Sequence, residues 1–67
     1  MNITLNNNTE VLEPEKLTIS DLLQVKNFTF KMLIVKVNGK LIPKNEYGET
    51  WIQGGDDVTV LHLISGG

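Results

Sequence analysis

The side chains that most often carry out chemistry are scarce in this 67-residue sequence. It has no cysteine, which excludes a thiol nucleophile, a thiolate zinc site and any disulfide bond. Its one histidine, His62, lies in an apolar stretch, where histidine is more often a packed or surface residue than a base or a ligand. Asp56 and Asp57 have no nearby donors to complete a metal site, and they suit a turn before a strand. We therefore expect no catalytic residue, no metal site and no bound cofactor, and hence no enzyme activity of its own.

The C-terminal end offers a different kind of chemistry. The sequence closes with Leu63-Ile64-Ser65-Gly66-Gly67, a strand-like segment that runs into two glycines. A diglycine has no side chains, so it can thread a narrow channel into the active site of another protein. A carboxylate is a poor electrophile until it is activated, commonly as an acyl-adenylate made from ATP. Gly67 is therefore a candidate attachment site and Ser65-Gly66 a candidate insertion segment, although a frayed terminus is the alternative.

Composition and charge exclude several classes of function. The net charge is −2, arginine is absent and the six lysines are dispersed, which is unlike a nucleic-acid-binding protein. No apolar stretch approaches the roughly 20 residues that cross a bilayer, and residues 1–5 do not resemble a signal peptide. We expect a soluble cytoplasmic protein with one domain over residues 1–67, in which residues 65–67 form a flexible tail.

The first half of the sequence predicts a hairpin and a helix. Ile3 and Leu5 alternate with polar residues, an asparagine-rich turn follows at 6–9, and residues 10–12 return as a second strand. Thr18 is a good N-cap for a short helix that ends near residues 26–27. Its apolar stripe comprises Ile19, Leu22 and Leu23, and we also assign Val25 to it.

The second half predicts three further strands. Residues 31–37 are β-rich, and Asn38-Gly39 favours a tight hairpin turn into residues 40–42, which Pro43 limits to a short edge strand. Residues 44–51 have no clean period and suggest a turn or a single helical turn. Residues 58–64 are almost continuously apolar, which is typical of a central strand. The order strand–strand–helix–strand–strand–strand predicts an α+β fold, with a mixed sheet of four to five strands packed on one main helix.

One face of this sheet has no helix to cover it. The short helix must pack on the opposite face, whereas Ile34, Leu61 and Leu63, with Met32, point away from it. An uncovered apolar patch on a small protein is often a contact surface, so these four residues are candidates for partner docking. The alternative is that they are merely scattered over an antiparallel sheet.

The combination of these features resembles the thiamine-biosynthesis sulfur-carrier (ThiS) family of the ubiquitin-like β-grasp superfamily. The resemblance spans the whole chain and is strongest in residues 37–43, Val-Asn-Gly-Lys-Leu-Ile-Pro, and in residues 56–67, from Asp-Asp-Val to the terminal Gly-Gly. The asparagine-rich first turn and the spacing around residues 27–31 depart from the family pattern, but neither touches the tail.

The resemblance implies a cycle that takes place on partner enzymes. A ThiF-like, ubiquitin-activating-like adenylyltransferase, using ATP and magnesium, adenylates the Gly67 carboxylate. A sulfur donor protein then displaces AMP and leaves a thiocarboxylate, and the loaded tail enters a ThiG-like thiazole synthase and donates its sulfur to the thiazole of thiamine. No nucleic acid or membrane takes part.

Two other interpretations stay open at this point. A related carrier could feed molybdopterin synthesis, as a MoaD-like protein does, or tRNA thiolation, with the same chemistry at Gly67. A β-grasp module that binds a protein or RNA, and whose diglycine has no sulfur chemistry, is the alternative from another functional class.

Overall fold

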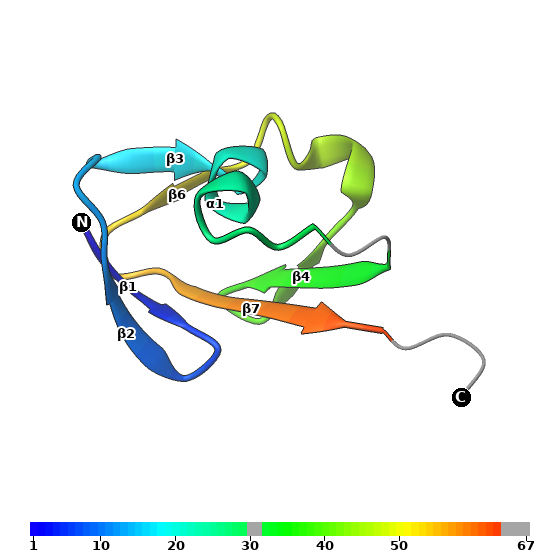
Figure 1. The fold of residues 1–67 in the computed structure, drawn as a ribbon, viewed down its shortest axis with the longest axis horizontal. Coiled ribbons are helices and arrows are strands. Elements are labelled where there is room, and N and C mark those ends of the chain that lie inside the picture. Colours follow the sequence, from blue (N-terminus) through cyan, green and yellow to red (C-terminus); the bar gives the residue numbers. More distant parts are fainter. Residues whose placement is uncertain (30–31, 64–67) are drawn as a thin grey trace.

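The computed structural model of the chain describes residues 1–29 and 32–63. Its main sheet has five strands in the order β2-β1-β7-β4-β5, and a separate pair, β3-β6, forms a second sheet (Figure 1). The elements in chain order are β1 (Asn2–Leu5), β2 (Asn8–Val11), β3 (Lys16–Thr18), α1 (Ile19–Val25), β4 (Leu33–Val37), β5 (Lys40–Ile42), the 3-10 helix η1 (Lys44–Glu46), β6 (Trp51–Gln53) and β7 (Asp57–His62). The predicted α+β class, and the predicted order of the helix and the five main strands, are confirmed.

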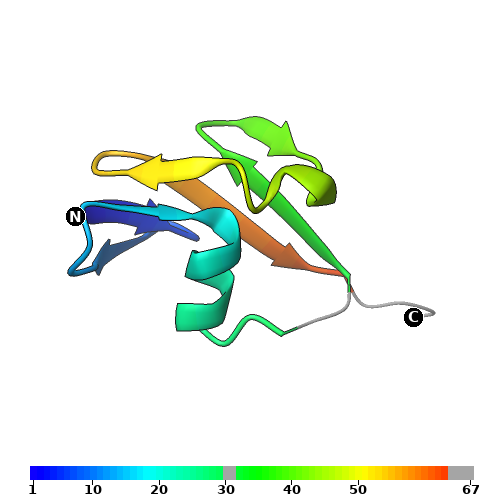
Figure 2. The same ribbon diagram turned by 90° about the horizontal axis from the view of Figure 1, so that it is seen from above.

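The sheet is mixed because β1 and β7, the first and the last strand of the chain, are neighbours in its middle and run parallel to each other. The other neighbours, β1-β2, β4-β5 and β4-β7, are antiparallel. Seen from above, α1 lies over one side of this sheet, and β7 ends far from the N-terminus (Figure 2). No helix within residues 1–29 and 32–63 is long and apolar enough to cross a membrane.

The β1-β2 turn uses two asparagines in the left-handed region. Asn6 has φ 50° and Asn7 has φ 67°, as a two-residue type I′ hairpin turn requires. Asn6, the first residue of this turn, also extends the pairing of β1 with β7 by one residue. Its N–H donates to the Val58 carbonyl at 2.9 Å, and its Oδ1 accepts from the Val60 N–H at 2.8 Å. The asparagine-rich turn therefore has a structural role in the central pair of strands.

The helix begins where the sequence predicts. The Thr18 Oγ1 accepts a hydrogen bond from the Asp21 N–H at 3.1 Å, which satisfies one of the unpaired donors of the first turn. Ile19 and Leu22 are fully buried, and Leu23 is half-buried against the core. Val25 is 59% exposed, so its assignment to the stripe is wrong. At 100° per residue it lies about 240° around the helix from Ile19.

Two turns at one end of the sheet are tied together by side chains. Asn38 and Gly39 form the predicted β4-β5 turn with φ values of 52° and 81°. The Asn38 Nδ2 donates to Asp56 Oδ1 at 3.1 Å, and the Asn38 Oδ1 accepts from the Asp57 N–H at 2.9 Å. The second Asp56 oxygen accepts from the Gln53 N–H at 2.9 Å. The prediction that this segment leads into the last strand is confirmed for Asp56, whereas Asp57 is not a turn residue but the first residue of β7.

The β3-β6 pair is the main departure from the predicted elements. Residues 44–51 do begin with a helical turn, η1, but Trp51 belongs to β6 and pairs with Thr18 of β3. The Lys16 ammonium lies 4.9 Å from the centre of the Trp51 ring, a cation–π contact on the exposed side of this pair. On the inner side, Leu17 lies opposite the fully buried Ile52. Strands of three residues are too short to show a period in the sequence.

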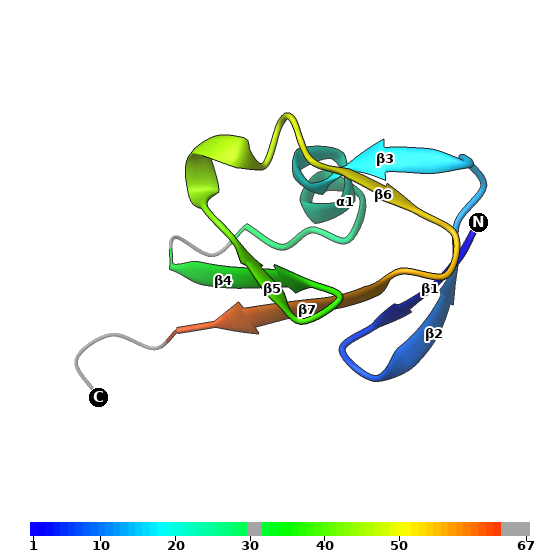
Figure 3. The same cartoon turned by 180° about the vertical axis from the view of Figure 1, so that it is seen from behind.

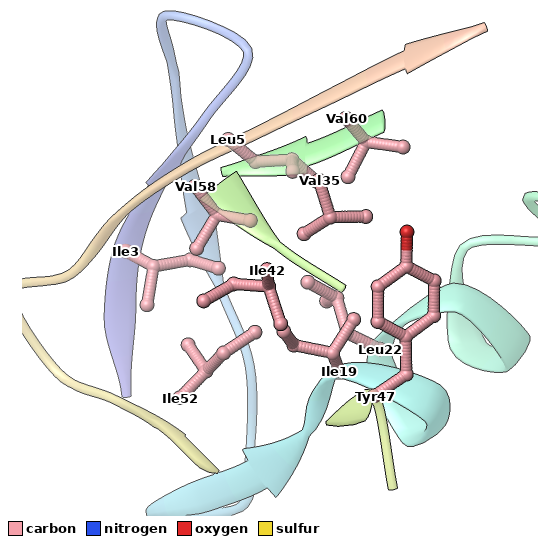
Figure 4. Close-up of a cluster of buried hydrophobic side chains, with 10 residues drawn as sticks. All are labelled: Ile3, Leu5, Ile19, Leu22, Val35, Ile42, Tyr47, Ile52, Val58 and Val60. Atoms are coloured by element: carbon pink, nitrogen blue, oxygen red, sulfur yellow. The ribbon is translucent and has the colours of Figure 1, made fainter. Parts of the chain in front are cut away.

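Within residues 1–29 and 32–63, ten buried hydrophobic residues form a cluster between the sheet, α1 and β6 (Figure 4). Alternate residues of β4 and β7 supply its floor, with Val35 opposite Val60 and Val37 opposite Val58. The full set is Ile3, Leu5, Ile19, Leu22, Val35, Ile42, Tyr47, Ile52, Val58 and Val60. The core therefore fixes which face of β7 points inward, and so which residues of its end remain accessible.

Candidate functional site

The segment that leads to the C-terminal tail is the central strand of the sheet, as predicted. β7 has β1 on one side and β4 on the other, and it pairs with β4 from Val58 through His62 (Figure 3). One more hydrogen bond, from the Leu63 N–H to the Met32 carbonyl at 2.9 Å, continues this pairing beyond the strand. The chain is thus held up to Leu63. The predicted tail residues Ser65, Gly66 and Gly67 lie outside the described residues, and their roles stay predictions.

Two of the four predicted docking residues lie opposite each other on the face of the sheet that α1 leaves uncovered. Ile34 of β4 pairs with Leu61 of β7, while their neighbours Val35 and Val60 point into the core. Leu61 is 47% exposed, and Ile34 is half-buried. These two residues and Leu41 form what we call the outer-face patch.

Leu41 is a member of the outer-face patch that the sequence analysis missed. It lies opposite Lys36, which shares a face of β4 with Ile34, and it is 59% exposed. The signal was available in the Asn38-Gly39 turn. A two-residue turn fixes the register of the strands that it joins, so Leu41 must face outward if Ile42 faces the core.

The other two predicted docking residues, Met32 and Leu63, line a pocket of about 380 Å³. Its walls come from the end of α1, the start of β4 and η1, and they include Leu23, Phe28 and Tyr47. We call it the end pocket, because it lies where β7 ends. The four predicted residues are therefore split into two neighbouring groups on either side of the strand end, rather than forming one face.

The end pocket has few polar groups. Thr29 and Lys44 contribute to its lining, and the ring of Tyr47 lies at one margin of the core cluster (Figure 4). Burial raises the pKa of the Tyr47 phenol above its ordinary value, so this side chain stays neutral at physiological pH. Among the described residues that line the pocket, Lys44 is then the only one with a charged side chain.

The remaining residues that could do chemistry do not converge. His62 lies opposite Leu33 at the exposed end of β7. Asp56 takes part in the turn described above, far along β7 from that end. In the described part of the chain, no three histidine, aspartate or glutamate residues gather closely enough to hold a metal ion.

Comparison with known proteins gives one consistent result. The model of the ThiS family matches residues 2–67. The crystal structure of a thiamine biosynthesis protein (ThiS) from Geobacter metallireducens superposes with a TM-score of 0.90 at 26% identity, over all of both chains. A solution structure of a thiamine biosynthesis protein from the same organism gives a TM-score of 0.81 at 28% identity, over all of this chain and 88% of that one. A search of curated proteins gives no match.

Proposed function

Since this chain belongs to the ThiS family, with the ubiquitin-like β-grasp fold of its solved relatives, we propose that it is a sulfur carrier protein of thiamine biosynthesis. The observation that carries the proposal is the extent of the family match, which runs through the diglycine at residues 66–67. The carrier is a substrate of its partner enzymes rather than a catalyst.

The proposed chemistry takes place at the carboxylate of Gly67. A ThiF-like adenylyltransferase, with its own ATP and magnesium, transfers an adenylyl group to this carboxylate and releases pyrophosphate. Sulfur at the oxidation level of sulfide, supplied by a sulfur donor protein, then attacks the acyl carbon; the bond to AMP breaks, AMP leaves, and a thiocarboxylate remains. The thiocarboxylate anion is a good nucleophile at neutral pH, and it passes its sulfur to the forming thiazole ring in a ThiG-like synthase.

The fold supports this chemistry by presenting the tail on a rigid base. Because β7 is hydrogen-bonded to β1 at its start and to β4 up to its end, the tail leaves the domain from a fixed position at Leu63. Positioning of a reacting group by a bound scaffold can supply a large part of a rate enhancement. Gly66 and Gly67 then present no side chain to the walls of a narrow active site.

Intact-mass measurement tests the proposal. The purified chain is incubated with the cognate adenylyltransferase, ATP, magnesium and a sulfur source. Conversion of the C-terminal carboxylate to a thiocarboxylate should add about 16 Da, the difference between one sulfur and one oxygen atom. If the mass never shifts, the carrier function is wrong. Rescue of a thiamine-requiring strain, compared with a molybdopterin-requiring strain, then identifies the pathway that receives the sulfur.

The outer-face patch is proposed to dock these partner enzymes. We expect Leu61→Ala to weaken binding to the adenylyltransferase about tenfold, because a buried apolar contact at the centre of an interface often contributes more than 1 kcal/mol. Calorimetric titration of the two proteins measures the effect.

Val25→Ala is the matched control for this variant. It removes a similar amount of exposed apolar surface, at 59% exposure, from the helix instead of the sheet. Equal affinities of both variants and the unsubstituted chain would mean that the outer-face patch does not dock the enzyme.

A further inference from the structure

The end pocket is a preformed feature with a fixed inner wall. Tyr47 and Leu33 belong to its lining, and Tyr47 is also a member of the buried core, while Leu33 packs against that core. Leu23 and Phe28 pack against the same cluster from the helix and the connection after it. Because these four residues are held by the core, the pocket does not need to be formed by its ligand.

The rim of the pocket is apolar and accessible. Met32 is 48% exposed and Leu63 is 40% exposed, and the Leu63 N–H is hydrogen-bonded to the Met32 carbonyl. Leaving two large apolar side chains at the mouth of an apolar pocket costs hydration free energy that a ligand would recover. A volume of about 380 Å³ is enough for one aromatic or aliphatic side chain together with part of its neighbours.

The charge of Lys44 indicates which group of a ligand should lie next to the apolar side chain that enters the pocket. Lys44 begins η1 and is exposed at the pocket, and within residues 1–29 and 32–63 the one ion pair is between Lys26 and Glu10. An ammonium next to an apolar pocket favours a ligand that has a carboxylate next to its apolar part.

The position of the pocket relates it to the tail. Leu63 forms part of its wall and is followed directly by residues 64–67, the segment that a partner must grasp to reach Gly67. Any enzyme that encloses those residues therefore has its own surface next to the pocket. A second copy of this chain, or a free small molecule, does not need to enclose residues 64–67, so nothing places it next to the pocket.

From these observations, and resting on the proposed function, we propose that the end pocket receives an apolar side chain of the adenylyltransferase, with an acidic residue beside it that pairs with Lys44. The adenylyltransferase then contacts this chain on two sides of the end of β7, at the outer-face patch and at the end pocket. The pocket is a second contact, distinct from the sheet surface.

The two methionines of this chain allow a direct test that does not depend on activity. Met32 lies at the rim of the pocket, whereas Met1 lies at the opposite end of the molecule, partly buried against the core. In a sample labelled with ¹³C at the methionine methyl groups, we expect addition of the adenylyltransferase without ATP to shift or broaden the Met32 signal and to leave Met1 comparatively unaffected. An unchanged Met32 signal in a complex that calorimetry shows to be formed would overturn the proposal.

Two substitutions test the chemistry of the contact. We expect Lys44→Glu to weaken binding to the adenylyltransferase about tenfold and Met32→Ala to weaken it about fivefold, as for contacts of moderate importance in an interface. Lys40→Glu is the matched control, because it makes the same change in net charge at an exposed residue of β5 that does not line the pocket. Equal effects of the two lysine substitutions would show a general charge effect and contradict the pairing with Lys44.

Two other possible occupants of the end pocket, the chain's own tail and a second copy of the chain, would give different results. Nuclear Overhauser contacts from the Ile64 methyl groups to Leu23 and Phe28 in the free chain would show that its own tail fills the pocket. A Met32 signal that changes with the concentration of the chain alone would show a second copy. Either result overturns the proposal. If the unsubstituted chain gains about 16 Da but Met32 stays unaffected on binding, the sulfur-carrier function stands and only the pocket proposal fails.

Discussion

Removal of Gly67 alone is expected to abolish loading of the carrier with sulfur. The shortened chain still ends in a glycine carboxylate, but that group stops about 3.5 Å short of the position that the full tail reaches. Misplacement of a reacting group by about 1 Å can already cost a factor of about 100 in rate. We therefore expect no detectable gain of about 16 Da under conditions that load the unsubstituted chain completely.

Two controls separate this effect from a loss of folding or binding. The thermal unfolding midpoint should be unchanged, because residue 67 lies beyond the last described backbone hydrogen bond, at Leu63. Calorimetric affinity for the adenylyltransferase should fall much less than the loading rate, since both docking surfaces remain. Complete loading of the shortened chain would exclude Gly67 as the attachment residue.

Of the surface substitutions considered for this chain, Asn38→Asp is expected to have the largest effect on stability. In this chain the Asn38 amide donates to one Asp56 oxygen at 3.1 Å and accepts from the Asp57 N–H. The substitution replaces the donor by a carboxylate, so two negative charges face each other where a hydrogen bond had been. We expect a loss of about 2–3 kcal/mol, from one lost hydrogen bond and repulsion between partly exposed charges.

Such a loss is large for a chain of this size. A domain of 67 residues is expected to have a free energy of unfolding of about 3–10 kcal/mol. At about 4–8 °C per kcal/mol, a loss of about 2–3 kcal/mol should lower the midpoint of thermal unfolding by about 8–24 °C. The loss should shrink as the pH falls toward about 3, since protonation of either carboxylate removes a repulsion that is present only in the folded state. The stability of the Asn38→Asp variant is therefore closest to that of the unsubstituted chain at low pH, and the difference between them grows as the pH rises.

Two further variants identify the cause. Asn45→Asp makes the same change of charge in η1, where no described hydrogen bond of this side chain would be lost, and it should cost less than 0.5 kcal/mol, roughly the range of neutral surface substitutions. Asn38→Gly removes the bridge without adding charge, and glycine accepts the φ of 52° at this position, so its loss of stability should be intermediate. If Asn38→Asp and Asn45→Asp are equally stable, the bridge between the two turns does not stabilise the fold.

The sequence was most informative where a local pattern and a tertiary requirement agree. The Asn38-Gly39 turn, the Thr18 cap and the apolar run in β7 each have a local physical cause, and the structure has all three. The central position of β7 was also predictable, because a long and almost continuously apolar strand is typical of the interior of a sheet.

The sequence was least informative where contacts between distant residues decide the structure. The β3 and β6 strands have three residues each, and they exist because Leu17 and Ile52 meet in the core, 35 positions apart in the chain. The division of the predicted docking face has a similar cause. Alternation in β7 places Leu63 with Leu61, but the strand ends at His62, and the residue that follows packs toward the end of α1.

The parallel pairing of β1 with β7 has a mechanical consequence. A force that draws the tail into a partner enzyme acts along β7, across the hydrogen bonds that join this strand to β1 and β4. Such a pull loads the bonds of both ladders in shear, all at once, instead of breaking them one after another. Because Asn6 adds its own bonds at the far end of the β1 ladder, the domain should bear tension on its tail without losing its sheet.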